Sequence, residues 1–155
     1  MMLEVGQPAP ALSLPTDGGG HFDLAALNPP AVVYFYPKDD TPACTNEGKD
    51  FSALIADFAA AGAVIIGVSR DSVKKHDRFK LKHDLAVILA SDEAGAVCEA
   101  WGVWVEKTLY GRKYMGVERA TFLIDRDGRI ARVWRQVRVA GHAAEVLGAV
   151  RALNG

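Results

Sequence analysis

Three segments of the chain are apolar almost without interruption, and each is bounded by turn-forming or charged residues. They span residues 31–36, 63–68 and 85–90. Uniformly apolar runs of this length are typical of strands that are buried on both faces, as in a parallel sheet. The pattern therefore predicts three inner strands.

The segments between these strands carry helical patterns. Apolar residues recur at i, i+3, i+4 and i+7 between Phe51 and Phe58, which predicts a helix from residue 42 to about residue 61, ended by Gly62. A second, charged helix is predicted from residue 71 to about residue 83. Because strand and helix alternate, we expect crossover connections and a largely parallel sheet with helices on its faces.

The two ends of the chain indicate antiparallel structure and a final helix. Near the N-terminus, three consecutive glycines at 18–20 separate short apolar stretches, as in a hairpin packed at the domain edge. Residues 121–124 and 130–134 flank an Asp-Gly turn and predict a second hairpin that closes the sheet. Apolar positions over 143–150 predict a last amphipathic helix. The whole pattern predicts one α/β domain over residues 1–155, with a mixed central sheet flanked by helices.

The composition narrows the classes of partner. The 155-residue chain is 50% hydrophobic and 24% charged, which suits one globular domain whose core needs no disulfide bonds. A net charge of −1 provides no general attraction to phosphate backbones or anionic membranes, so we expect neither nucleic acid nor a membrane as partner. The N-terminal residues lack the basic start and apolar core of a signal peptide, and no apolar run approaches ~18 residues. A cytoplasmic location is therefore expected.

Cysteine and histidine are too few and too scattered to predict a metal site. Cys44 and Cys98 are the only cysteines, which excludes a disulfide framework, a cysteine-rich zinc site and a Cys-x-x-Cys pair. The histidines show no convincing metal-ligand spacing, so no metal cofactor is expected and each is predicted to lie at the surface. They are His21, His76, His83 and His142.

The segment after the first strand places a cysteine at the start of a helix. Thr41 suits the N-cap, Pro42 suits the first helical position because its missing N–H costs nothing there, and Cys44 falls at the third. Unpaired N–H groups and the aligned peptide dipoles of a first turn favour an anion. Cys44 is therefore a candidate reactive thiolate, whereas a buried, inert side chain is the commoner role of an isolated intracellular cysteine.

Two motifs resemble those of a known family. Pro37, Thr41 and Cys44 match the Pro-x-x-x-Thr-x-x-Cys pattern of the peroxiredoxins in residue type and spacing. Residues 116–125 resemble the segment in which that family carries its second active-site arginine, here Arg119. Two distant parts of the chain thus agree on the same family.

The rest of the chain extends the resemblance. Residues 91–93 and 102–104 resemble the bacterioferritin-comigratory, or Q-type, branch, and the likeness runs from Gly6 to the C-terminal helix. It implies a thioredoxin-like fold and the reduction of hydrogen peroxide or organic hydroperoxides without a metal, haem, flavin or nucleotide cofactor. It also implies thioredoxin or a similar thiol as reductant, and a monomer.

The resemblance assigns roles at the site. Cys44 would attack the peroxide as a thiolate, and Arg119 would stabilise the thiolate and the departing oxygen. Thr41 would contact the thiolate and the peroxide, and Pro37 would shield the thiolate from water. The residues alone are also compatible with structural roles: Thr41 would be a helix cap, Pro37 would end a strand, and Arg119 would be an exposed strand residue. Glu47 stands where the family commonly has glutamate or glutamine, but we interpret it as a helix-face acid paired with lysine, outside the predicted site.

Recycling of the oxidised cysteine departs from the family pattern. Q-type peroxiredoxins often carry a resolving cysteine five residues after the reactive one, where this chain has Lys49, and another branch has it at the position of Lys80. Cys98 is the only internal candidate, but it shares a predicted helical face with Val97 and Trp101, which favours packing. We therefore expect a one-cysteine cycle with an external thiol, and resolution by Cys98 is the alternative.

Two other functions are compatible with a reactive cysteine. A thioredoxin-like disulfide exchanger would need a second thiol one helical turn after Cys44, where the residue is Glu47. A non-catalytic peroxide sensor or redox-regulated binding protein would use the same thiolate. Nothing in the sequence separates such a sensor from a peroxidase.

Overall fold

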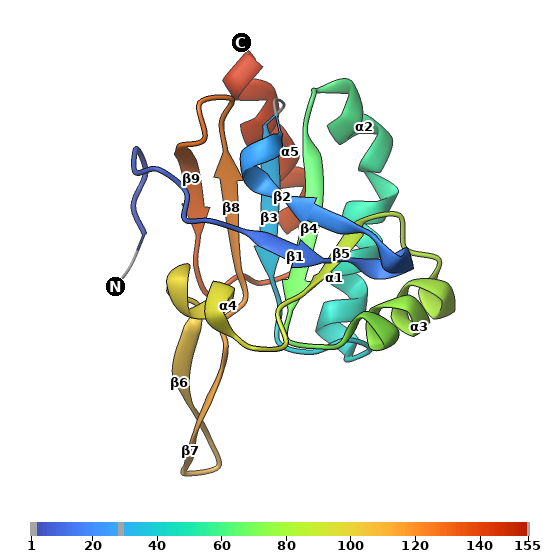
Figure 1. The fold of residues 1–155 in the computed structure, drawn as a ribbon, viewed down its shortest axis with the longest axis vertical. Coiled ribbons are helices and arrows are strands. Elements are labelled where there is room, and N and C mark those ends of the chain that lie inside the picture. The colour runs from blue at the N-terminus through green and yellow to red at the C-terminus, as the bar shows by residue number, and fades with distance from the viewer. Residues whose placement is uncertain (1–2, 28–29, 155) are drawn as a thin grey trace.

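A five-stranded mixed sheet forms the centre of the molecule (Figure 1). The computed structural model describes residues 3–27 and 30–154; the other residues of the predicted domain, among them Met1 and Met2 of the N-terminal stretch, lie outside the described residues. The strand order is β5-β4-β3-β8-β9. These strands are β3 (Ala31–Phe35), β4 (Val64–Ser69), β5 (Ile88–Ser91), β8 (Ala120–Ile124) and β9 (Ile130–Trp134).

The sheet is parallel in one half and antiparallel in the other. β3 pairs in parallel with β4, and β4 with β5. β3 also pairs antiparallel with β8, which pairs antiparallel with β9. The Asp125 carboxylate holds the turn between β8 and β9 by accepting the N–H groups of Asp127 and Arg129 at 2.9 and 3.0 Å. The predicted mixed sheet and C-terminal hairpin are therefore confirmed.

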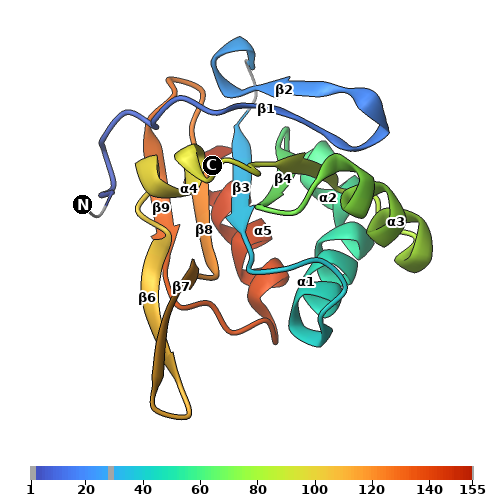
Figure 2. The same cartoon turned by 60° about the horizontal axis from the view of Figure 1, so that its bottom comes forward.

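Different elements cover the two faces of the sheet (Figure 2). One face carries the predicted N-terminal hairpin, β1 (Ser13–Pro15) and β2 (His21–Asp23), together with the short helix α4 (Ala96–Ala100). The opposite face carries α1 (Pro42–Ala53), α2 (Ile55–Ala60) and α5 (His142–Asn154). Helix α3 (Val73–His83) lies beside β5, and two 3-10 turns, η1 (Asp17–Gly19) and η2 (Leu24–Ala26), lie within and after the N-terminal hairpin.

Alternate side chains of β3 enter two separate hydrophobic cores. Val33 and Phe35 join the core that contains residues of the N-terminal hairpin and α4. Val32 and Tyr34 join the core that contains residues of α1, α2 and α5. This alternation is the two-residue period of a strand that is buried on both faces, so the uniformly apolar run is explained.

The long helix predicted over residues 42–61 is in fact two helices. Leu54 leaves the helical conformation at φ −102° and ψ 8°, and its N–H is donated to the carbonyl of Phe51. α2 resumes at the next residue. Because Phe51 and Phe58 are both buried in the same core, the apolar spacing continues across the break and hides it.

The strand predicted over residues 85–90 is shorter in the structure, where β5 begins at Ile88. Leu85 and Val87 are nonetheless 5% and 0% exposed, because they fill the core from the segment that follows α3. Asp84 adopts φ +52° and ends α3. An apolar run therefore reports burial here rather than strand pairing.

A hairpin that the sequence pattern does not predict extends away from the sheet (Figure 1). It comprises β6 (Trp104–Leu109) and β7 (Arg112–Val117). Tyr110 and Gly111 form its two-residue turn with φ of 51° and 77°, as primed hairpin turns require. Most of its side chains are partly or fully exposed, so no apolar face marks it in the sequence.

Two of the four histidines predicted to lie at the surface are buried. His76 is 0% exposed and lies 2.6 Å from an Asp39 carboxylate oxygen, and His142 is 7% exposed and lies 2.8 Å from the Thr121 hydroxyl. Burial of an imidazole requires such hydrogen-bond partners, and a sequence pattern does not show them. His21 is exposed, as predicted.

Candidate active site

Cys44 lies in the first turn of α1, which begins at one end of the central sheet. The chain leaves β3 and reaches α1 through a short loop, residues 36–41 (Figure 2). Thr41 is the N-cap residue, its carbonyl oxygen accepts the N–H of Thr45 at 2.8 Å, and Pro42 begins the helix. The predicted helix start is confirmed, and it leaves the sulfur among the unpaired N–H groups of the first turn.

Antiparallel pairing brings Arg119 to the same end of the sheet. Ala120 of β8 pairs with Phe35 of β3, so Arg119, one residue before β8, lies beside the residues that follow β3. Arg119 Nη2 donates to Cys44 Sγ at 3.2 Å. Cys44 is only 2% exposed and the Arg119 side chain 13%. A guanidinium and the positive end of α1 therefore both attract negative charge at a sulfur that is almost shielded from water.

Glu47 belongs to the same cluster, so its interpretation as a helix-face acid paired with lysine is wrong. It is 1% exposed, and its Oε1 accepts from Arg119 Nη1 at 2.6 Å. Burial raises the pKa of Glu47 to about 7, although the positive charge of Arg119 acts in the opposite direction. Its Oε2 has no hydrogen-bond partner among the described residues. Glu47 follows Cys44 by three residues, and this helical spacing is the sequence signal that places both on one face.

Thr41 and Pro37 lie in the loop before α1. The Thr41 hydroxyl donates to the carbonyl oxygen of Lys38 at 2.9 Å and makes no side-chain hydrogen bond that caps α1. Because its proton is engaged, the Thr41 oxygen presents its lone pairs and can accept a further hydrogen bond. Pro37 is half-buried directly after Tyr36.

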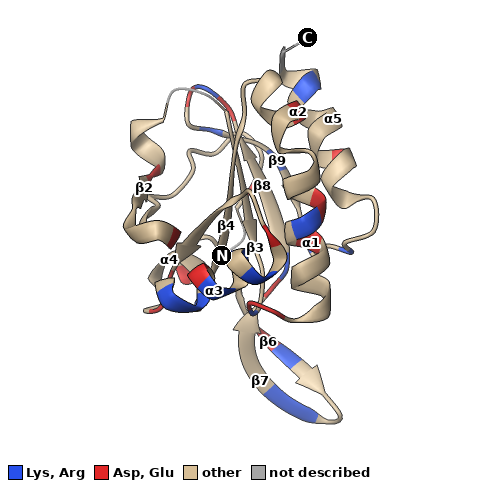
Figure 3. Ribbon diagram, turned by 90° about the vertical axis from the view of Figure 1, so that its right-hand side faces the viewer, with Lys and Arg blue, Asp and Glu red and all other residues tan. Residues whose placement is uncertain are grey.

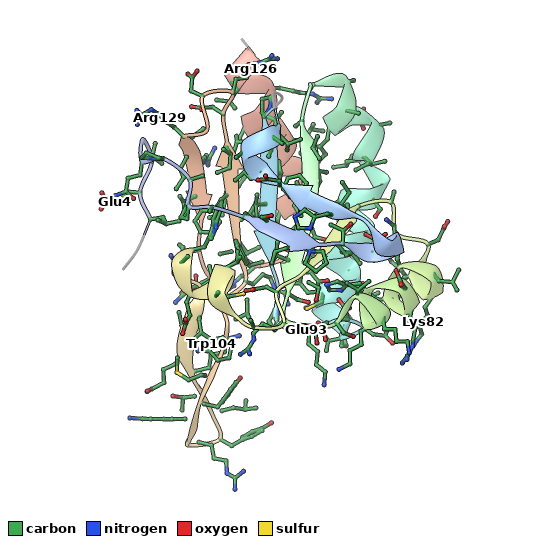
Figure 4. All side chains as sticks on the ribbon, viewed as in Figure 1. Glu4, Lys82, Glu93, Trp104, Arg126 and Arg129 are labelled. Atoms are coloured by element: carbon green, nitrogen blue, oxygen red, sulfur yellow. The ribbon has the colours of Figure 1, made fainter. Side chains whose placement is uncertain are left out.

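A groove of ≈ 430 Å³ separates Pro37 from the β6–β7 hairpin. Trp104 and Glu93, labelled in Figure 4, line it, and the guanidinium of Arg70 lies 4.6 Å from the centre of the Trp104 ring. Apolar atoms of residues 114–117 form another part of the wall. Figure 3 marks Lys and Arg positions in blue along the ribbon of the hairpin and of α3. The groove thus combines an apolar wall with positive charge next to the loop of the candidate site.

Known proteins show which family has this arrangement. The AhpC/TSA family matches residues 5–133. The chain is 48% identical to Peroxiredoxin Bcp of Bacillus subtilis, over 95% of this chain and 94% of that one. The structure of the Xanthomonas campestris bacterioferritin comigratory protein, described for its alkyl peroxide reduction activity, is similar with a TM-score of 0.91 and 46% identity, covering 98% of this chain and all of that one. The chain belongs to the AhpC/TSA family.

Within the AhpC/TSA family the similarity is to one group of peroxiredoxins. A structure of PrxQ from Xylella fastidiosa has a TM-score of 0.94 and 39% identity, covering all of this chain and 99% of that one. The prediction of a peroxiredoxin related to the bacterioferritin-comigratory or Q-type branch is therefore confirmed. The predicted thioredoxin-like α/β fold is confirmed by the same similarities.

Cys98 lies on the opposite face of the central sheet from this cluster. It is 0% exposed in the core on the α4 face of the sheet, whereas Cys44 belongs to the core on the α1 face. The predicted packing of Cys98 with Trp101 is thus observed. At the two family positions for a resolving cysteine, Lys49 is exposed and Lys80 Nζ donates to Asp17 at 2.8 Å.

Over the described ranges, 3–27 and 30–154, no three His, Cys, Asp or Glu side chains gather in a way that could hold a metal ion. The helices in those ranges also include none that is long and apolar enough to cross a membrane.

Proposed function

We propose that this AhpC/TSA family member, a thiol-dependent peroxidase, reduces peroxides through Cys44. The observation that carries the proposal is the contact between Arg119 Nη2 and Cys44 Sγ, in the first turn of α1. A thiolate nucleophile needs nearby positive charge, and so does the oxygen that departs when the O–O bond breaks. One guanidinium next to the sulfur serves both needs.

The reaction is a displacement at a peroxide oxygen. The Cys44 thiolate attacks the terminal oxygen, a sulfur–oxygen bond forms, and the O–O bond breaks. The other oxygen leaves with the bonding electron pair and takes up a proton to become water or an alcohol. Arg119 and the backbone N–H of Cys44 offer hydrogen bonds to the negative charge that develops, and Cys44 is left as a sulfenic acid.

The loop before α1 orients the peroxide. The Thr41 oxygen is free to accept the O–H of the peroxide because its own proton is donated to Lys38. Pro37 has no N–H with which to hold water and lines the groove beside the loop, so its proposed role is to shield the Cys44 sulfur from water. Both hydrogen peroxide and organic hydroperoxides are proposed substrates, since the apolar wall of the groove can accommodate an alkyl group.

An external thiol restores Cys44 in the proposed cycle. Attack of that thiol on the sulfenic acid releases water and gives a mixed disulfide, which a second thiol reduces. Thioredoxin or a similar thiol donor is the proposed reductant. The position of Cys98 in the core on the other face of the sheet supports a one-cysteine cycle, since a disulfide requires Cα atoms within about 7 Å of each other.

Peroxide consumption with a supplied thiol tests the proposal against a sensor. A peroxidase consumes many equivalents of peroxide per protein in the presence of thioredoxin or dithiothreitol. A non-catalytic sensor reacts with one equivalent and stops, so a stoichiometric end point would contradict the proposal.

The oligomeric state, the domain organisation and the cellular location of the protein are also proposals. We propose a monomer that forms one domain over residues 1–155 and acts in the cytoplasm. Light scattering on the reduced and oxidised protein tests the monomer, and limited proteolysis tests the single domain. Cell fractionation tests the location, and recovery in the periplasm would contradict it.

A further inference from the structure

His76 is a fully buried histidine whose two ring nitrogens both face acceptors. It lies on α3, remote from Cys44 in the sequence, and is 0% exposed. Its Nδ1 lies 2.6 Å from Asp39 Oδ2, and its Nε2 lies 2.9 Å from the carbonyl oxygen of Ala90. A carboxylate and a carbonyl can only accept hydrogen bonds, so this geometry favours a proton on each ring nitrogen. The surroundings therefore favour the imidazolium form of His76.

The surroundings of His76 support its charged form. Burial by itself would lower the pKa of His76, but the hydrogen bond and negative charge of Asp39, together with the Ala90 carbonyl, raise it above its ordinary value. Asp39 is itself only 8% exposed, so the two charges form a buried pair. Such a pair has a well-defined geometry because neither partner can turn to water.

The same network fixes the backbone of the loop before α1. The Tyr36 hydroxyl donates to Asp39 Oδ1 at 2.5 Å. The peptide N–H of Asp39 donates to Asp71 Oδ2 at 2.8 Å, and the Ser69 hydroxyl donates to that same oxygen at 2.7 Å. Asp39 is therefore held by its side chain to α3 and by its peptide to the segment after β4.

Asp40 provides a second connection between this loop and α3. Its carboxylate accepts from Lys82 Nζ at 2.8 Å, and its other oxygen lies 2.7 Å from His83 Nε2. Asp40 also has φ +60°, in the left-handed region that few residues other than glycine, asparagine and aspartate adopt. The loop is consequently held in one conformation from the side of α3.

This loop carries two of the proposed site residues. Pro37 and Thr41 flank the anchored segment, and the Thr41 hydroxyl is oriented by the carbonyl of Lys38, the residue directly before Asp39. A shift of Asp39 would therefore move Lys38 and turn the Thr41 oxygen away from the approaching peroxide. A misplacement of about 1 Å in a reacting group is enough to cost ~100-fold in rate.

We propose that His76 is a positioning residue for peroxide reduction, whose imidazolium, paired with Asp39, holds the 37–41 loop so that Pro37 and Thr41 stay in place at Cys44. This inference rests on the proposed role of Cys44. It assigns no contact between His76 and the peroxide, since His76 acts only through Asp39.

The positioning effect has a defined pH dependence. Because the pKa of His76 is raised, the pair is complete at and below the ordinary histidine pKa of about 6.5 and is lost as pH rises through the raised value. The titratable groups that face His76 are Asp39 from the loop, Tyr36 from the end of β3 and Asp71 from the segment before α3. Tyr36 remains neutral, because burial raises its pKa well above the ordinary value.

The test separates peroxide positioning from thiolate formation. Stopped-flow measurement gives the rate constant for oxidation of Cys44 by hydrogen peroxide, and iodoacetamide gives the alkylation rate of the same thiolate. For His76→Gln we expect the oxidation rate constant to fall by ~10- to 100-fold, while alkylation changes far less, because alkylation needs the thiolate but not the Thr41 oxygen. Lys74→Gln is the matched control, since it removes a positive charge from an exposed site on the same helix and should change neither rate.

Asp39→Asn provides a second variant that keeps a side chain of the same shape beside Tyr36, and it should show the same difference between oxidation and alkylation. If a folded variant loses oxidation and alkylation rates equally, or loses neither, the positioning role of His76 is overturned. At alkaline pH the wild-type oxidation rate constant should approach that of His76→Gln, and a constant ratio across pH would also overturn it. Failure of peroxide to oxidise Cys44 in the wild type would instead contradict the proposed function itself.

Discussion

Cys44 and Cys98 are both almost completely buried near the beginning of a helix, but their polar neighbours carry opposite charges. Cys44 receives a hydrogen bond from the Arg119 guanidinium at 3.2 Å. The peptide N–H of Cys98 is donated to a carboxylate oxygen of Asp92 at 2.8 Å. The helices also differ, since α1 has 12 residues and α4 only five.

The difference explains why we propose Cys44, and not Cys98, as the reactive cysteine. Burial raises the pKa of Cys98, and the nearby Asp92 raises it further, so Cys98 remains a thiol. At Cys44 the same exclusion of water strengthens the attraction of Arg119 for a negative sulfur. Burial increases the effect of the nearest charge, and in the proposed reaction the sign of that charge distinguishes the nucleophile Cys44 from the packing residue Cys98.

Replacement of the sulfur itself should have the largest effect. Cys44→Ser is expected to lower peroxide turnover by ~1,000-fold or more, because a serine hydroxyl does not ionise near neutral pH. Peroxide consumption measured with circular dichroism checks both activity and fold. Cys98→Ser is the matched control, and retained turnover in a folded Cys44→Ser variant would refute the assignment of Cys44.

Removal of the positive neighbour should have the next largest effect. Arg119→Ala is expected to slow oxidation of Cys44 by ~100- to 1,000-fold, because the thiolate and the departing oxygen lose the same donor. Stopped-flow kinetics measures the rate of Cys44 oxidation, and the ultraviolet absorbance of the thiolate measures its formation. Arg138→Ala removes an exposed arginine and serves as control. If Arg119→Ala is oxidised as fast as the wild type, Arg119 has only a structural role, and its positive charge does not explain the reactivity of Cys44.

The carboxyl of Glu47 shares the Arg119 guanidinium with Cys44, the proposed reactive cysteine. The pKa of Glu47 is raised in the folded protein to about 7, so the folded state binds the extra proton and loses stability as pH rises through that value. Between pH 4 and pH 8, the free energy of unfolding of the wild type should fall by about 3 kcal/mol more than that of the Glu47→Gln variant. Urea unfolding at both pH values checks it. A constant difference would show that Glu47 ionises normally.

Changes at Cys98 should have the smallest effect on activity. Cys98→Ala removes a sulfur from a packed core and is expected to cost about 1–2 kcal/mol of stability while thiol-dependent turnover is preserved. Thermal unfolding and steady-state turnover measure the two effects separately. Loss of turnover with unchanged stability would identify Cys98 as the resolving cysteine.

Much of the fold follows from local patterns in the sequence. β3 and β4 are recognisable because both of their faces are buried, so all positions before Ser69, the last residue of β4, are apolar. The break at Leu54 escapes prediction because Phe51 and Phe58 keep the same spacing on either side of it. The β6–β7 hairpin escapes it because its exposed strands have no apolar face.

Some residues of the candidate site are placed by a local sequence pattern, and others depend on partners that are distant in the sequence. Thr41 and Cys44 are placed by one helix start, which three adjacent positions encode. Glu47 and His76 depend on Arg119 and Asp39, partners 72 and 37 residues away. Pairings across such distances are set by the tertiary fold, so composition and periodicity do not reveal them.

Mass spectrometry of the protein after one equivalent of hydrogen peroxide tests the central contrast between the two cysteines most directly. With a dimedone-type probe present, we expect Cys44 to be labelled as a sulfenic acid and Cys98 to remain an unmodified thiol. Prompt formation of a Cys44–Cys98 disulfide in place of the label would contradict it, because the two sulfurs lie in cores on opposite faces of the sheet.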